Sequence, residues 1–166
     1  FVASSLSSVI IHQHEDLLRG RFYLLSFYLT MLADTGGNAG SQSAAVVIRA
    51  LALGQIRLKN WLWIVFKEVR VAFLLAVTFF IFTFCKVLLF SHGASPDGYT
   101  IHQLAFTIAL ALSFQVITST IIGAVLPLVA KFFKGDPAVA ASPAITTLVD
   151  ITGVLIYFKT AMLLLQ

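Results

Sequence analysis

Charge is scarce in this sequence. Only 11% of its 166 residues are Asp, Glu, Lys or Arg, whereas 59% are hydrophobic and the mean hydropathy is +0.96. A soluble globule of this length needs more polar surface than these residues supply. The composition therefore excludes a soluble domain and predicts an all-α integral membrane protein that contacts the lipid bilayer.

Cysteine and the common catalytic motifs are also lacking. Cys85 is the single cysteine and stands inside an apolar run, so disulfide bonds cannot organise the fold. The sequence contains no HExxH or CxxC motif, no glycine-rich phosphate loop and no pairing of a nucleophile with a base. We therefore predict that the protein is not an enzyme. A membrane-embedded metal-dependent enzyme with Asp34 and Asp150 as metal ligands is the alternative from another class.

The basic residues are scattered and form no patch of the kind that binds nucleic acid. We therefore expect no nucleic-acid partner, despite a formal net charge of +4. Seven of the eleven Lys and Arg residues stand in two connections, at about 49–70 and 131–135. If the spans alternate in direction, these connections share one side of the membrane, and the positive-inside rule makes that side cytoplasmic.

Apolar segments predict five membrane spans in one domain over residues 1–166, at about 1–12, 22–53, 62–90, 104–130 and 137–165. The first segment is shorter than the roughly 20 helical residues that cross a bilayer, so we interpret it as the end of a truncated span. The sequence opens on Phe1 without an initiator Met or a basic leader. We therefore expect a fragment whose upstream part is missing.

The last predicted span carries one carboxylate, Asp150, within an apolar run. An ionised carboxylate at this depth costs roughly 2.5–3.5 kcal/mol on insertion scales, so it faces a partner or a wet cavity rather than lipid. Ser142, Thr146, Asp150 and Gly153 recur at steps of four, four and three, which places them on one helix face. Close packing alone would explain Thr146 and Gly153, but packing needs no charge. The stripe therefore predicts a pore wall.

A second polar stripe lies in the predicted span at 22–53. Asp34, Asn38, Ser41 and Ala45 follow helical spacing, with Gly37 and two further glycines among them. We expect irregular backbone at 34–42, which survives in a membrane only inside protein or beside a wet cavity. A glycine packing face is the alternative, although Asp34 and Asn38 exceed what packing requires. The two stripes together indicate an ion pathway.

Other polar residues have local interpretations. Polar residues of the fourth span, among them Ser113 and Gln115, are predicted to join helices, with a wetted pore wall as the alternative. Asp136 stands before a proline and is predicted to cap the last helix, although it can also lie at a pore mouth. Glu68 is surrounded by basic residues, and we interpret it as a surface ion-pair partner.

The donor atoms of the two stripes indicate the cargo. Carboxylate, hydroxyl and amide oxygens without His or Cys suit Mg²⁺, Ca²⁺ or Mn²⁺, whereas zinc and copper usually recruit imidazole or thiolate. Mg²⁺ keeps several waters and needs one or two carboxylates among small hydrogen-bonding groups. One chain has too few polar faces to enclose an ion, so we predict a homodimer with two copies of Asp150 near its axis. A divalent cation would offset their repulsion.

Four segments then occur in a specific order. They are DTGGNAGSQS at 34–43, IRALA at 48–52, DPA at 136–138, and Pro143 followed by TTLVDITGVLIYF at 146–158. Together they resemble the transmembrane domain of the MgtE magnesium channels, and the resemblance covers nearly the whole chain.

The resemblance implies a homodimeric Mg²⁺-selective channel of the bacterial inner membrane. Its pore would be lined by the second and fifth spans of both subunits, with Asp150 at the central site. A Na⁺-coupled or other divalent-cation exchanger, as among related eukaryotic carriers, is the alternative. Combined with the stripes, the resemblance predicts metal-binding roles for Asp150, Thr146, Asn38, Ser41, Asp136 and Asp34, and pore-lining positions for Ser142, Gly153, Gly37 and Ala45.

The sequence also departs from the family it resembles. Asp34 stands where relatives carry Gly, and its extra carboxylate would strengthen cation binding or loosen the preference for Mg²⁺. Ser142 stands where relatives carry Asn. The family's cytosolic N domain and CBS domains, which sense Mg²⁺ and close the pore, have no counterpart in these residues. We expect that they were either removed or replaced by regulation elsewhere.

Overall fold

A computed structural model of the protein describes residues 2–13, 23–56, 60–91 and 99–165, with the backbone alone for residues 2–7, 23 and 140–142. Within these ranges every regular element is an α-helix, which confirms the predicted all-α class. The helices are α1 (Val2–Gln13), α3 (Tyr23–Ala52), α4 (Trp61–Phe90), α5 (Ile101–Phe132) and α6 (Pro137–Leu165).

Three of these helices, α4, α5 and α6, are long and apolar enough to cross a membrane. α3 has 30 residues and is therefore about 45 Å long, but the polar residues at its centre lower its hydropathy. α1 has only 12 residues, fewer than a span requires. The structure thus supports an integral membrane protein, and the expected count of five spans stays a prediction.

The backbone at 34–42 is helical, so the expected irregular segment is wrong. α3 continues from Tyr23 to Ala52 without a break. Two of its glycines, Gly36 and Gly40, serve close packing instead, because both are buried against neighbouring helices. A Cβ built on Gly40 would lie only 3.0 Å from the carbonyl oxygen of Ser119 on α5. The helix tolerates these glycines because its neighbours occupy the space that side chains would fill.

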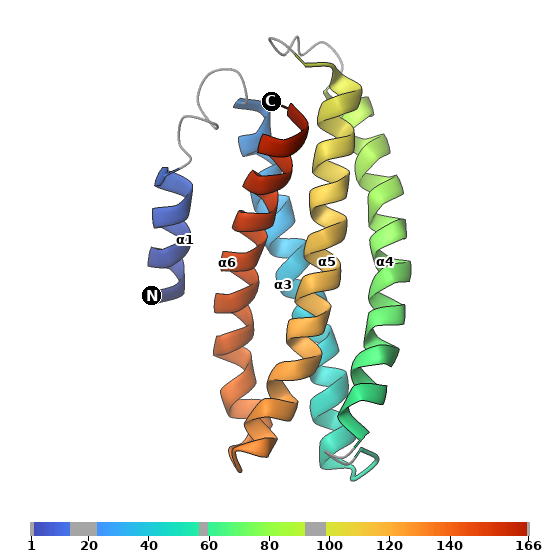
Figure 1. Cartoon of the computed structure of the whole chain (residues 1–166), viewed down its shortest axis with the longest axis vertical. Helices are drawn as coiled ribbons and strands as arrows, with labels where there is room; N and C mark the ends of the chain where they lie inside the picture. Colours follow the sequence, from blue (N-terminus) through green and yellow to red (C-terminus); the bar gives the residue numbers. More distant parts are fainter. Residues whose placement is uncertain (1, 14–22, 57–59, 92–98, 166) are drawn as a thin grey trace.

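α5 is the central helix of the bundle. It packs against α3, α4 and α6, whereas α3 also contacts α6, and α1 contacts α6 (Figure 1). A large apolar core lies towards the end where α3 begins and α6 ends, and it includes Leu25, Leu104, Leu112 and Tyr157. The Tyr157 hydroxyl donates to the Leu25 carbonyl oxygen at 2.7 Å, which ties α6 to α3. α5 therefore holds in place the two helices that carry the predicted stripes.

α4 lies at the edge of the bundle and exposes large apolar side chains (Figure 1). Its buried positions include the small residues Ala72 and Ala76. Phe73, Leu74 and Phe82 are each more than 60% exposed. An apolar surface of this extent is unusual for a protein in water and typical of a surface that meets another apolar phase.

The two basic connections lie at the same end of the bundle. α3 and α5 end there, and α4 and α6 begin there (Figure 1). Asp136 caps α6 as predicted, because its carboxylate accepts a hydrogen bond from the Ala138 amide at 2.8 Å. At the opposite end, Thr100 and Gln103 form a reciprocal capping box that starts α5 at Ile101, three residues before the predicted start.

Candidate functional site

Asp150 lies in the middle of α6 with its side chain partly exposed. In the part of the chain that the structure describes, its carboxylate has no hydrogen-bonding or ion-pair partner. Thr146, one turn earlier, is exposed, and its hydroxyl donates to the Pro143 carbonyl oxygen at 3.1 Å. The Thr146 hydroxyl donates its proton within α6, so its oxygen keeps its capacity as an acceptor. This face of α6 offers oxygen acceptors without internal partners.

The predicted polar stripe of α3 lies on the exposed side of the helix. Asp34, Asn38, Ser41 and Ala45 are exposed, so the predicted stripe forms one open face of the helix. Gly37 is partly exposed, and a Cβ built there would meet nothing within 4 Å. Space beside this face is therefore open within the single chain.

Residues of the two open faces lie at one level of the bundle. A Cβ built on Gly40 of α3 would lie 3.3 Å from methyl carbons of both Ile145 and Val149 on α6. Those two residues directly precede Thr146 and Asp150, while Asn38 and Ser41 lie beside Gly40. The structure therefore brings the α3 pair, Asn38 and Ser41, to the same level as Thr146 and Asp150.

Other predicted site residues lie elsewhere. Asp136 is at the start of α6, and its 14-residue separation from Asp150 corresponds to about 21 Å along a helix. Asp34 precedes Asn38 by one turn, or about 6 Å. Gly153 is buried, and a Cβ there would lie 2.6 Å from the amide nitrogen of Gln115. The Ser142 side chain falls outside the described part of the structure.

The donor set at this level is entirely oxygen. It comprises the Asp150 carboxylate, the Thr146 and Ser41 hydroxyls, and the Asn38 amide. Within the described ranges, no three His, Cys, Asp or Glu side chains group together as a metal cage. Oxygen donors of this kind suit hard cations such as Mg²⁺, which keep part of their hydration shell.

Gln115 has a more specific position than the sequence indicated. The side chain is fully buried on α5, and its Nε2 donates to the Val149 carbonyl oxygen on α6 at 2.9 Å. The Ser113 hydroxyl donates to the Ala76 carbonyl oxygen on α4 at 3.0 Å and shares its proton with the Ala109 carbonyl oxygen of its own helix at 2.8 Å. These two bonds confirm that polar residues of this span join helices. Thr118 and Thr120 instead donate to carbonyl oxygens of their own helix.

Glu68 is buried, so its interpretation as a surface ion-pair partner is wrong. Only 8% of the residue is exposed, and its carboxylate accepts a hydrogen bond from the Ser43 hydroxyl of α3 at 2.9 Å. It lines a cavity of about 300 Å³ between α3 and α4, together with Arg49 and Lys67. The error has a physical cause. Basic neighbours in sequence point to several sides of a helix, and the face that meets α3 is decided by packing.

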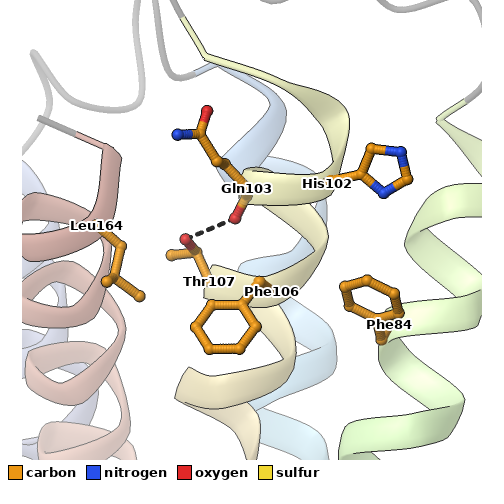
Figure 2. Close-up of a pocket in the computed structure, with 6 residues that line it drawn as sticks. All are labelled: Phe84, His102, Gln103, Phe106, Thr107 and Leu164. Atoms are coloured by element: carbon orange, nitrogen blue, oxygen red, sulfur yellow. Dashed lines mark hydrogen bonds between the residues drawn. The ribbon is translucent and has the colours of Figure 1, made fainter.

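A separate pocket of about 430 Å³ lies near the end of the bundle opposite the basic connections. Figure 2 shows His102 extending from α5 above Phe84 of α4, with Leu164 of α6 on the other side. Thr107 donates to the backbone carbonyl of Gln103 at 2.8 Å. None of the predicted site residues lines this pocket, so it is distinct from the Asp150 level.

Comparison with known families decides the family of this chain. The sequence model of MgtE, described as a divalent cation transporter, matches residues 29–160. The chain belongs to the MgtE family. The MgtE match runs from α3 to α6 and includes every predicted metal-binding and pore-lining residue.

Sequence similarity to individual MgtE proteins agrees with this family assignment. The chain is 35% identical over 161 residues to a magnesium transporter MgtE of Thermus thermophilus, covering 97% of this chain and 34% of the relative. It is 35% identical over 156 residues to the Bacillus subtilis protein of the same name, covering 94% of this chain and 33% of the relative. The chain thus spans about a third of the length of these MgtE relatives.

Proposed function

We propose that this protein conducts hydrated Mg²⁺ across a membrane, through a pore between two copies of the chain with Asp150 at the central site. One observation carries the proposal. The Asp150 carboxylate lacks a partner among the described residues, and it stands at the level of Asn38 and Ser41 on an adjoining open face. A carboxylate inside a span needs such a polar or wet environment.

The donor chemistry supports Mg²⁺ as the cargo. Carboxylate, hydroxyl and amide oxygens are hard ligands, and small neighbours such as Gly37 and Ala45 leave room for a hydrated ion. The relatives from Thermus thermophilus and Bacillus subtilis are both named magnesium transporters. Metal-binding roles for Asp34 and Asp136, at other levels of the helices, would place further carboxylates along the route of the ion.

The exposed polar faces support a homodimer. In a bilayer, the open faces of α3 and α6 would meet hydrocarbon unless protein or water covered them. A second copy of the same faces, related by a two-fold axis, would enclose a polar pathway with two Asp150 side chains. A divalent cation between them would reduce their mutual repulsion.

The outer surface supports the placement in the bilayer. The exposed phenylalanine and leucine side chains of α4 suit contact with lipid. The basic residues at the end where α4 and α6 begin support a cytoplasmic location for that end. We infer passage down the electrochemical gradient, with the ion crossing between this end and the opposite one.

Mg²⁺ flux into liposomes tests the proposal. Asp150→Asn removes the charge at nearly constant volume and is expected to reduce Mg²⁺ flux at least tenfold. Glu68→Gln is the matched control, because it also changes one span carboxylate to an amide and keeps an acceptor for Ser43. Its flux should stay within about twofold of wild type, because Glu68 lies outside the two polar faces and the amide keeps the side-chain volume and the hydrogen bond to Ser43.

The same liposomes separate the proposed channel from an exchanger. Each protein is measured with and without a sodium gradient, and the channel should conduct equally in both. Flux that requires sodium would replace the channel by a coupled carrier. Wild-type flux that survives Asp150→Asn unchanged would place the ion elsewhere in the molecule.

A further inference from the structure

We propose that Gln115 is a positioning residue for the ion site, because it holds Asp150 on α6 at a fixed position relative to the Asn38 segment of α3. The inference rests on the proposed function, because Gln115 can position an ion site only if Asp150 binds the ion. It assigns to α5 a part in the pathway, although α5 supplies none of the predicted metal-binding residues.

The amide of Gln115 lies where three helices meet. A Cβ built on Gly36 of α3 would lie 2.5 Å from Nε2 of Gln115, and one on Gly153 of α6 would lie 2.6 Å from the same atom. Both glycines therefore make room for this side chain. Any side chain at either position would displace the amide or separate the helices.

The hydrogen bond of Gln115 acts directly beside Asp150. Its Nε2 donates at 2.9 Å to the carbonyl oxygen of Val149, and this carbonyl belongs to the peptide unit that joins Val149 to Asp150. The bond therefore restrains the rotation of α6 about its own axis at the level of the carboxylate. Pro143, about two turns before Asp150, cannot donate a backbone hydrogen bond within α6, which makes a restraint from outside the helix more important.

The other polar atom of the Gln115 amide, Oε1, guides the choice of substitution. Oε1 of Gln115 is buried and has no hydrogen-bonding partner among the described residues. A buried acceptor without a partner lowers the stability of the folded state. Methionine would fill a similar volume without this cost. Gln115→Met therefore removes the hydrogen bond to Val149 without leaving a polar atom of its own side chain buried.

Ser113 provides the matched comparison on the same helix. Its hydroxyl also donates to a backbone carbonyl of another helix, that of Ala76 on α4, away from the two polar faces, and shares its proton with the Ala109 carbonyl oxygen of α5. Ser113→Ala and Gln115→Met thus each remove one bond from α5 to a neighbouring helix. Only the second removes a bond that reaches the peptide unit of Asp150.

The test measures Mg²⁺ flux into liposomes as a function of Mg²⁺ concentration, with Ca²⁺ as the competing ion, for wild type, Gln115→Met and Ser113→Ala. Thermal unfolding of each protein is followed in detergent. For Gln115→Met we expect an unchanged or higher unfolding temperature. The half-saturating Mg²⁺ concentration should rise about fivefold, which corresponds to the loss of one hydrogen bond. The preference for Mg²⁺ over Ca²⁺ should become weaker. Ser113→Ala should keep the wild-type half-saturation and preference.

Each result supports or overturns the inference. Equal half-saturation and ion preference in wild type and Gln115→Met would overturn it while leaving the proposed function intact. Absence of flux in wild type would overturn the proposed function, and this inference with it. If Gln115→Met fails to fold, Gln115→Asn takes its place, because its shorter amide cannot reach the Val149 carbonyl. Failure of both variants to fold, with Ser113→Ala folded, would show a structural role only.

Discussion

Two glycines allow α3 and α5 to touch. A Cβ built on Gly123 of α5 would lie 2.8 Å from the carbonyl carbon of Gly40 and would overlap the oxygen of that carbonyl. Both residues are buried, so neither backbone can move away without opening the bundle. Gly37 lies on the open side of α3, where a methyl group would meet nothing within 4 Å. Glycines of one segment thus have opposite roles.

We predict that Gly123→Ala destabilises the protein by about 1–3 kcal/mol, because the new methyl group overpacks the contact with Gly40. Gly37→Ala should leave stability unchanged or raise it by up to about 1 kcal/mol, since alanine has the higher helix propensity. Denaturant unfolding in detergent, followed by tryptophan fluorescence, would measure both. Equal effects of the two substitutions would contradict the assigned packing.

At the scale of elements, side chains rather than close backbone contact connect α3 to α4. Tyr28 and Ser91 share a hydrogen bond of 2.8 Å towards one end, and Ser43 and Glu68 share one of 2.9 Å towards the other. Both pairs are buried. The helix α4 is otherwise held by α5, so these bonds fix its position relative to α3.

We predict that Ser43→Ala lowers the free energy of unfolding by about 1–3 kcal/mol, because it leaves the buried carboxyl group of Glu68 without its donor. Ser41→Ala, two residues away on the open face, is the control and should change stability by less than about 0.5 kcal/mol. Unfolding in detergent at matched protein concentration checks the pair. A larger effect of Ser41→Ala would mean that the two faces of α3 are reversed.

The whole molecule has two kinds of outer surface. The edge formed by α4 is apolar, whereas the faces of α3 and α6 that carry Ala45 and Asp150 are polar or small. A single copy in a bilayer would leave the second surface against hydrocarbon, which is unfavourable for unpaired polar groups. The proposed two-fold pairing covers this surface and leaves α4 outside.

We predict that Ala45→Cys, in a Cys85→Ser background, crosslinks two chains efficiently with a short bis-maleimide reagent, because Ala45 lies on the face proposed to border the axis. Leu74→Cys on α4 is also exposed and should crosslink poorly. Electrophoresis after reaction in membranes would measure the dimer yield. Equal yields from both positions, or a higher yield from Leu74→Cys, would exclude this pairing.

The sequence by itself determined the membrane class and the approximate helices. These properties depend on local composition and on helical spacing, so the cap at Asp136 was predictable without coordinates, whereas the roles of Asp150 and Asn38 stay predictions. The start of α5 could also have been predicted from the sequence, because Thr100 and Gln103 match the spacing of a capping box. The MgtE resemblance came from the same local segments.

The tertiary structure alone decided which way the remaining polar residues face. Gln115 and Val149, or Ser43 and Glu68, are joined across 34 and 25 residues of sequence, and helical periodicity does not fix how one helix is rotated against another. The same packing turned Gly153 towards Gln115 and kept α3 helical through its glycines. Contacts between distant helices depend on the shape of every side chain between them, and this information lies in the assembled bundle rather than in any single segment.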